Sequence, residues 1–160
     1  MEKRSVTRVA SCLCGGVKVR ILGKVRPVLN CHCSQCMKTH GNFAAYTECF
    51  EKDLNFIEKS TLKWFQSSSF AKRGFCSNCG GSVFYKLIKS DSISVSAGMF
   101  NYPTKLKTSS NIFVKGKLDY YSIDKRLKSF HRFSEKKKVW WSEQVKSRFK
   151  SKQSPRHIIP

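Results

Sequence analysis

The chain has 160 residues, eight cysteines and a formal net charge of +21. Its length predicts a single domain that is large enough to bury a core. No apolar stretch reaches the roughly 18 residues of a membrane span, and residues 1–5 lead into no apolar signal segment. We therefore expect a cytoplasmic protein with reduced thiols, in which clustered cysteines favour metal over disulfides. The charge favours anionic partners such as nucleic acid, an anionic membrane or an acidic metabolite.

The first cysteine pair is Cys12 and Cys14, which two glycines follow. Apolar and basic residues then alternate over residues 17–21, which predicts a half-buried strand. We expect the pair at a hairpin turn, because glycines permit the positive φ that such turns need. A Cys-x-Cys pair at this spacing does not by itself define a metal site.

The central motif is Cys31-His32-Cys33-Ser34-Gln35-Cys36, which places three thiols within six residues. Packing does not require this spacing, whereas thiolates on a tight turn converge on one soft divalent metal. Ser34 is expected to cap a short helix that runs to His40 and stops at Gly41. Two interpretations remain open. Either His32 or His40 adds a fourth ligand and makes the site structural, or three thiolates leave room for water or a substrate.

Further short strands are expected over residues 28–30, 43–50, 54–57, 62–65, 83–87, 93–97 and 111–114. Cys49 lies in one of them without a neighbouring cysteine, so it is interpreted as an ordinary buried residue. Long helical patterns are missing from the first 130 residues. The predicted fold class is therefore mainly β.

A Cys-x-x-Cys pair, Cys76 and Cys79, precedes two more glycines. This spacing is typical of a zinc knuckle, in which glycines let backbone N–H groups approach the sulfurs. With Cys12 and Cys14, the pair makes up a complete set of four thiolates. Thioredoxin-like redox chemistry is the alternative, but the following glycines and the missing βαβ pattern count against it.

The C-terminal stretch is strongly basic, because residues 125–160 carry 12 Lys and Arg against two Glu. We expect a domain over residues 1–133 and a basic extension over residues 134–160. Trp141, Val145 and Phe149 recur at helical spacing and predict a helix within that extension. The helix either packs on the domain, ahead of a disordered tail, or binds an anionic membrane or nucleic-acid phosphates.

Three motifs in this order resemble the glutathione-dependent formaldehyde-activating enzyme (GFA) family, which includes the centromere protein V branch. They are Cys12-Leu13-Cys14-Gly15-Gly16-Val17, the central hexapeptide and Phe75-Cys76-Ser77-Asn78-Cys79-Gly80. The resemblance covers about residues 5–133 and implies an Mss4-like β-tent of stacked antiparallel sheets with two zinc sites. It also implies which cysteines share an ion: a structural Zn²⁺ on Cys12, Cys14, Cys76 and Cys79, and a catalytic Zn²⁺ on Cys31, Cys33 and Cys36.

The activity that the resemblance implies is a carbon–sulfur lyase reaction, which joins glutathione and formaldehyde into S-hydroxymethylglutathione. The expected partners are therefore a small thiol such as glutathione and an aldehyde. Zinc on three thiolates would polarise a carbonyl oxygen or lower the pKa of a bound thiol. Three positions depart from the usual family pattern: Asn111 replaces a His, Leu118-Asp119-Tyr120 replaces Ala-Pro-Trp, and Met37-Lys38 replaces an Arg.

Two classes of function follow from the sequence. The predicted function is a zinc-dependent carbon–sulfur lyase that forms or breaks an S-hydroxymethyl thiol adduct. The alternative is a non-catalytic, zinc-stabilised binding module whose basic surface binds nucleic acid or an anionic membrane. Three cysteines without a fourth ligand favour the enzyme, whereas the departures from the family pattern and the charge favour the module.

Overall fold

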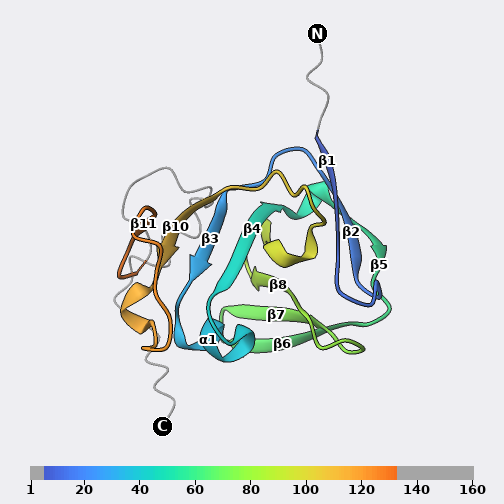
Figure 1. Cartoon of the computed structure of the whole chain (residues 1–160). Helices are drawn as coiled ribbons and strands as arrows, with labels where there is room; N and C mark the ends of the chain where they lie inside the picture. Colours follow the sequence, from blue (N-terminus) through green and yellow to red (C-terminus); the bar gives the residue numbers. More distant parts are fainter. Residues whose placement is uncertain (1–5, 133–160) are drawn as a thin grey trace.

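Two β-sheets make up most of the protein in a computed structural model, which describes residues 6–132 (Figure 1). One sheet has three strands in the order β1-β2-β5, and the other has eight in the order β11-β10-β3-β4-β9-β8-β7-β6. The prediction of a mainly β fold with stacked sheets is therefore confirmed. The expected basic C-terminal helix lies outside the described residues. Within residues 6–132, no helix is long and apolar enough to cross a membrane.

The three-stranded sheet is antiparallel throughout, as expected. It consists of β1 (Thr7–Ser11), β2 (Lys18–Leu22) and β5 (Leu54–Glu58). In β2 the Val19 and Ile21 side chains are fully buried, while Lys18 and Arg20 are exposed. The alternation seen in the sequence therefore marks one face of this sheet as the core face.

The eight-stranded sheet is antiparallel from β3 to β6 but parallel at its other edge. Its strands are β3 (Val28–Cys31), β4 (Ala44–Phe50), β6 (Leu62–Ser68), β7 (Ala71–Cys76), β8 (Ser82–Leu87), β9 (Ser92–Ser96), β10 (Thr108–Ile112) and β11 (Lys128–Ser129). β10 pairs in parallel with both β3 and β11, which departs from the expected antiparallel arrangement. A parallel neighbour needs a long crossover, which the intervening chain between β3 and β10 supplies.

The main core lies between the two sheets. Val19 and Ile21 of β2 contribute from the small sheet together with Val17, which directly precedes β2, and Phe84 and Val95 contribute from the large sheet. All five are fully buried, and each such side chain stabilises the fold by about 1.5–3 kcal/mol relative to its exposed state. Because this core covers one face of the large sheet, the opposite face is free to carry other chemistry.

Cys49 lies in β4 and belongs to this core, where it is fully buried. Burial raises the pKa of its thiol to about 12. Cys49 joins neither of the cysteine groups that the described residues form. Its interpretation as an ordinary buried residue is therefore confirmed.

A short helix, α1 (Ser34–His40), follows β3 and ends at Gly41, whose φ of 76° is left-handed. The predicted stop is confirmed, but the predicted cap is wrong. Cys33 occupies the N-cap position, its side chain makes no capping hydrogen bond, and Ser34 is the first helical residue. The extended backbone at Cys33 lets its carbonyl accept the Met37 N–H at 2.9 Å, which begins the helix one residue earlier than expected.

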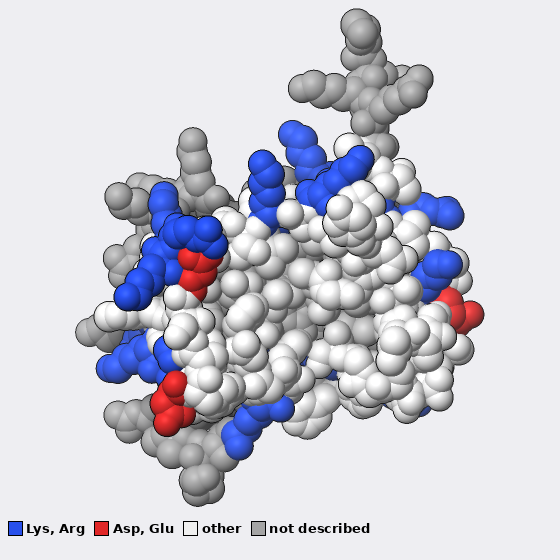
Figure 2. Space-filling model, viewed as in Figure 1, with Lys and Arg blue, Asp and Glu red and all other residues white. Residues whose placement is uncertain are grey.

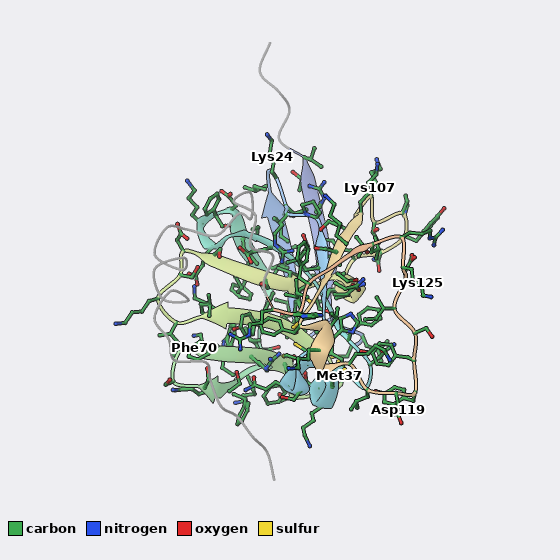
Figure 3. All side chains as sticks on the ribbon, turned by 90° about the vertical axis from the view of Figure 1, so that its left-hand side faces the viewer. Lys24, Met37, Phe70, Lys107, Asp119 and Lys125 are labelled. Carbon is green, nitrogen blue, oxygen red and sulfur yellow. The ribbon has the colours of Figure 1, made fainter. Side chains whose placement is uncertain are left out.

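Single-turn 3₁₀ helices connect several strands: η1 (Glu51–Asp53), η2 (Ala97–Met99) and η3 (Val114–Gly116). The turn η3 lies directly against the cysteine loop, because a β-carbon at Gly116 would be 2.8 Å from the carbonyl oxygen of His32. The following segment covers α1: the Tyr121 hydroxyl lies 3.3 Å from the Met37 sulfur. Figure 3 shows Met37 and Asp119 on neighbouring segments at this end of the molecule.

Candidate metal centres

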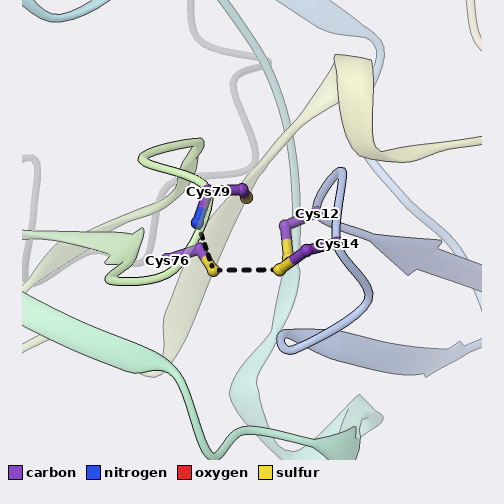
Figure 4. A group of neighbouring side chains, drawn as sticks. All are labelled: Cys12, Cys14, Cys76 and Cys79. Atoms are coloured by element: carbon purple, nitrogen blue, oxygen red, sulfur yellow. Dashed lines mark hydrogen bonds between the residues drawn. The ribbon is translucent and has the colours of Figure 1, made fainter.

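Two turns from different sheets bring the first four thiols together (Figure 4). Cys12 and Cys14 lie between β1 and β2, while Cys76 and Cys79 lie at the turn between β7 and β8. Their sulfurs all lie within 4.8 Å of one another, with 3.7 Å between Cys12 and Cys14 and 3.5 Å between Cys14 and Cys76. Zinc with bonds of about 2.3 Å holds tetrahedral sulfurs about 3.8 Å apart, so the group fits such an ion.

Hydrogen-bond donors surround these sulfurs. The Val17 N–H lies 3.2 Å from the Cys12 sulfur, and the Cys79 N–H lies 3.5 Å from the Cys76 sulfur. The Thr61 hydroxyl, 3.0 Å from Cys76, together with that N–H, lowers the pKa of the Cys76 thiol to about 6. Burial raises the pKa of Cys12 to about 11. Cys12 would therefore need a bound cation to be a thiolate at neutral pH.

The second group contains Cys31, Cys33 and Cys36, whose sulfurs also lie within 4.8 Å of one another. Cys31 ends β3, Cys33 caps α1, and Cys36 lies in the first turn of that helix. These residues pack with Ala44 and Tyr46 of β4 in a second cluster, separate from the main core. The group therefore occupies the face of the large sheet that the small sheet does not cover.

The three thiols of this group shift one another's pKa values through hydrogen bonds. Hydrogen bonds with Cys31 and Cys36 lower the pKa of the Cys33 thiol, and the hydrogen bond with Cys33 raises the pKa of Cys31. Hydrogen bonds from the Cys31 and Cys36 thiols would thus stabilise a thiolate at Cys33 in the absence of a cation. A divalent ion that prefers sulfur would support all three as thiolates, so this donor set also fits zinc.

Neither nearby histidine joins the second group. His32 is buried, with Nε2 3.1 Å from the Asn111 side-chain oxygen and Nδ1 2.5 Å from the Tyr121 hydroxyl. An amide oxygen only accepts, so Nε2 carries the proton and Nδ1 accepts from Tyr121. His40 contacts the Tyr46 hydroxyl through Nε2 at 3.3 Å. Among residues 6–132, the group is therefore made of three thiols alone.

Arg73 on β7 contacts the second group, although sequence reasoning assigned it no role. Arg73 is 8% exposed, and its guanidinium donates from Nη2 to the Gln35 side-chain oxygen at 3.1 Å and to the Cys36 sulfur at 3.8 Å. Gln35 in turn donates to the Ser67 carbonyl at 3.1 Å, which ties the hexapeptide to the end of β6. The available signal was its position three residues before Cys76.

Arg73 also retains unused hydrogen-bonding capacity. Its Nε and Nη1 atoms are buried and have no hydrogen-bond partner in the described part of the chain. A buried donor without a partner costs about 1–3 kcal/mol. This cost is incurred beside the three thiols, on the face of the sheet that carries the second group.

A cavity of about 310 Å³ lies on the other side of β3 from these thiols. Asn30 lines it, and Asn30 and Cys31 point to opposite faces because they are successive residues of one strand. The Asn30 amide donates to the Asn111 side-chain oxygen at 3.3 Å, which also contacts His32. A polar chain of side chains therefore joins the cavity wall to the cysteine loop.

These features define a class of protein: a two-sheet β domain with one four-thiol and one three-thiol group, both able to hold a metal ion. The chain belongs to the glutathione-dependent formaldehyde-activating enzyme family, whose model matches residues 7–116. The predicted family is therefore confirmed.

Two known proteins are similar to this chain. An uncharacterized lyase of Schizosaccharomyces pombe (strain 972 / ATCC 24843) is 24% identical over 122 residues, which cover 75% of this chain and 88% of the relative. A crystal structure of a Rhodobacter sphaeroides protein is 22% identical, with a TM-score of 0.49, and the match covers 59% of this chain and 88% of that one.

Proposed function

We propose that the chain is a zinc-dependent carbon–sulfur lyase of the GFA type, which forms or breaks an S-hydroxymethyl adduct of a small thiol. Glutathione and formaldehyde are the proposed substrates, because the family is named for them. The fission-yeast relative is itself named a lyase, which supports the same class of reaction. Cys12, Cys14, Cys76 and Cys79 are proposed to hold a structural zinc, and Cys31, Cys33 and Cys36 a catalytic one.

The observation that carries this proposal is the three-thiol group. Structural zinc sites normally have four protein ligands, whereas catalytic sites have three and keep one position for water or substrate. Within residues 6–132, the four-thiol group matches the first pattern and the three-thiol group matches the second. The chain thus carries two groups with different ligand numbers, as expected if they have different tasks.

A zinc ion on Cys31, Cys33 and Cys36 would lower the pKa of a substrate thiol and polarise a carbonyl oxygen. The side chains around it have supporting tasks. Cys33 and Cys36 are placed by the start of α1, and Gln35 ties that helix to the end of β6. His32 has both ring nitrogens engaged, so we assign it to holding the loop and not to proton transfer.

The alternative was a non-catalytic module that binds nucleic acid or an anionic membrane. The family match does not favour it. In Figure 2, Lys and Arg side chains lie mainly around the rim of the face shown, whereas its middle is mostly uncharged. The most basic part of the sequence, residues 134–160, lies outside the described residues.

The experiment that tests the proposal combines zinc content with turnover of glutathione and formaldehyde. Wild type should hold two zinc ions per chain and catalyse adduct formation, followed by NMR exchange between free and adduct formaldehyde. Cys33→Ser should retain one zinc, stay folded and lose activity. Cys49→Ala is the matched control, because it removes a thiol that lies in neither group, and it should keep both ions and full activity.

Two results would contradict the proposal. One is a wild-type protein with two zinc ions and no turnover of the adduct. The other is a Cys33→Ser protein that unfolds together with its four-thiol site, because the second group would then be a structural element of the fold.

A further inference from the structure

Arg73 is a buried cation that lies beside the second cluster without a carboxylate partner. Among the described residues, no carboxylate lies within ion-pair distance of it. Its guanidinium carbon lies 5.2 Å from the centre of the Tyr85 ring, and its hydrogen bonds within residues 6–132 both use Nη2. Tyr85 faces Arg73 directly across the β7–β8 pair. Arg73 is therefore held by contacts that leave its Nε and Nη1 donors unused, and these two donors point along different edges of the planar guanidinium.

Arg26 provides a comparison within the same protein, because it is equally buried but differently partnered. It forms an ion pair with Glu48 at 3.8 Å and donates to the carbonyl oxygens of Pro27 and Tyr46. Its donors are thus largely satisfied by the fold, with only Nε left over. Arg73 has two such donors and lies beside reactive thiols, which is a site suited to an oxygen ligand.

The charge around the second group is suited to such a ligand. Three thiolates and a divalent ion carry a net charge of −1, which the Arg73 guanidinium, 3.8 Å from the Cys36 sulfur, neutralises. An oxygen that gains negative charge there would meet no net repulsion. Nε or Nη1 could donate a charge-assisted hydrogen bond to such an oxygen, from a planar group that its contacts with Gln35 and Tyr85 hold in place.

We propose that Arg73 forms an oxygen-binding subsite beside Cys31, Cys33 and Cys36, and that it binds the oxygen derived from the aldehyde. When a thiolate sulfur adds to a carbonyl carbon, the carbon–sulfur bond forms and the π electrons of the carbonyl move to its oxygen. That oxygen then takes a proton from solvent, and the reverse reaction returns it. The identity of this oxygen rests on the proposed function, whereas the subsite itself rests on the buried guanidinium.

The first test is independent of turnover and uses formate, a one-carbon oxygen anion that cannot add a thiol. Binding of ¹³C-formate to the zinc-loaded protein is measured by NMR titration. Arg73→Met should weaken formate binding at least tenfold, and Arg73→Lys should restore only part of the affinity because it keeps the charge but loses the planar group with its fixed donor positions. Lys72→Met is the matched control: it removes one positive charge from the adjacent residue, which stacks on Trp64. It should bind formate like wild type.

The second test separates a role in catalysis from a role in structure. Arg73→Met should lower kcat for adduct formation by about 100-fold, as for loss of an oxyanion donor, with the KM for the thiol within about threefold. Zinc content and the thermal midpoint are measured on the same samples. If Arg73→Met unfolds, Arg73→Lys takes its place, with a smaller loss of kcat expected and the same unchanged zinc content.

The outcomes distinguish this inference from the proposed function. Formate binding that depends on Arg73, without turnover in wild type, would support the subsite and overturn the proposed function. Turnover in wild type with no effect of Arg73→Met on formate or kcat would overturn the subsite alone. Loss of zinc in Arg73→Met and in Arg73→Lys, with formate binding unchanged, would also overturn it and make Arg73 a structural counter-charge.

Discussion

A buried ion pair between Arg26 and Glu48 supports the face of the large sheet that carries the three-thiol group. Both side chains are less than 10% exposed, and the Ser94 hydroxyl donates to the Glu48 carboxylate at 3.3 Å. Removing one partner of such a pair leaves an uncompensated charge, whereas replacing both by apolar residues is often neutral. The contribution of the pair to stability is therefore visible only when both positions are changed.

Glu48→Ala should accordingly lower the free energy of unfolding by about 3–5 kcal/mol, because Arg26 is left buried and unpaired. The double variant Arg26→Met/Glu48→Leu should recover most of that loss. Urea unfolding, followed by tryptophan fluorescence in zinc-loaded protein, gives both values. A double variant as unstable as Glu48→Ala would show that the pair itself, and not the unpaired charge, sets the cost.

The same pair predicts a dependence on pH. Burial raises the pKa of Glu48 above its ordinary value of 4.5, although the Arg26 charge opposes this. The folded state then holds the Glu48 proton more tightly than the unfolded state, so this contribution to stability is full below 4.5 and is lost as pH rises. Relative to the double variant, wild type should gain stability as the pH falls toward 4.5. A difference that stays flat would contradict the raised pKa.

Cys49 should be the one thiol that is chemically silent in the folded protein. It is fully buried, and the pKa of its thiol is about 12, so almost no thiolate is exposed to a reagent at neutral pH. After zinc removal under conditions that keep the fold, a thiol-specific dye should label at most seven of the eight cysteines. The eighth should react only on addition of denaturant, and mass spectrometry of the digested protein should place it at Cys49.

At the scale of single elements, the close approach of η3 to the cysteine loop leads to a further prediction. Gly116→Ala would place a β-carbon 2.8 Å from the His32 carbonyl oxygen, so one of the two backbones must move. We expect a loss of about 1–3 kcal/mol and weaker zinc binding at the three-thiol group, measured by competition with a chelator. Gly98→Ala is the control, because its β-carbon would meet nothing closer than 4.0 Å.

The elements that could be predicted from the sequence are those with a clean local pattern. The strict alternation in β2 and the glycine after α1 gave their positions correctly. β7 was missed, because its burial pattern does not alternate and its charged Arg73 is nevertheless buried. β11 was missed because it has only two residues, and such a strand depends on the neighbour that it pairs with.

The residues of the candidate site also fall into those that a local sequence pattern predicts and those that it does not. Cysteine spacing identified all seven thiols of the two groups, because ligands of one metal ion are often only a few residues apart in the sequence. The assignment of Cys12 and Cys14 to the same group as Cys76 and Cys79 came from the family resemblance, and the structure now brings these four together. Arg73 and Asn111 contribute through contacts between distant strands, which local pattern does not encode.

At the scale of the whole molecule, the two groups differ in what they connect. The four-thiol group joins a turn of the small sheet to a turn of the large sheet (Figure 4), whereas the three-thiol group lies within one continuous segment. A structural zinc contributes on the order of 10 kcal/mol when only the folded state binds it. Loss of an ion that links the two sheets should therefore lower the free energy of unfolding far more than loss of an ion bound within one loop.

Cys76→Ser should consequently lower the thermal midpoint much more than Cys33→Ser, and should abolish cooperative unfolding if the sheets separate. Differential scanning calorimetry of both variants, with zinc content measured in parallel, provides the comparison. Equal shifts in the two variants would mean that the bridge between the sheets is not held mainly by the metal.

If both groups bind zinc as proposed, the spacing of their ligands along the chain also sets the order in which the ions can be acquired during synthesis. Residues 31–36 leave the ribosome together, so a nascent chain can capture its first zinc there before any sheet is complete. The other ion must wait until residue 79 has emerged and the two turns have met. In a zinc-poor cell, the three-thiol group would be the first to bind zinc. Chains that lack an ion would then lack it at the four-thiol group, and their two sheets would not be linked.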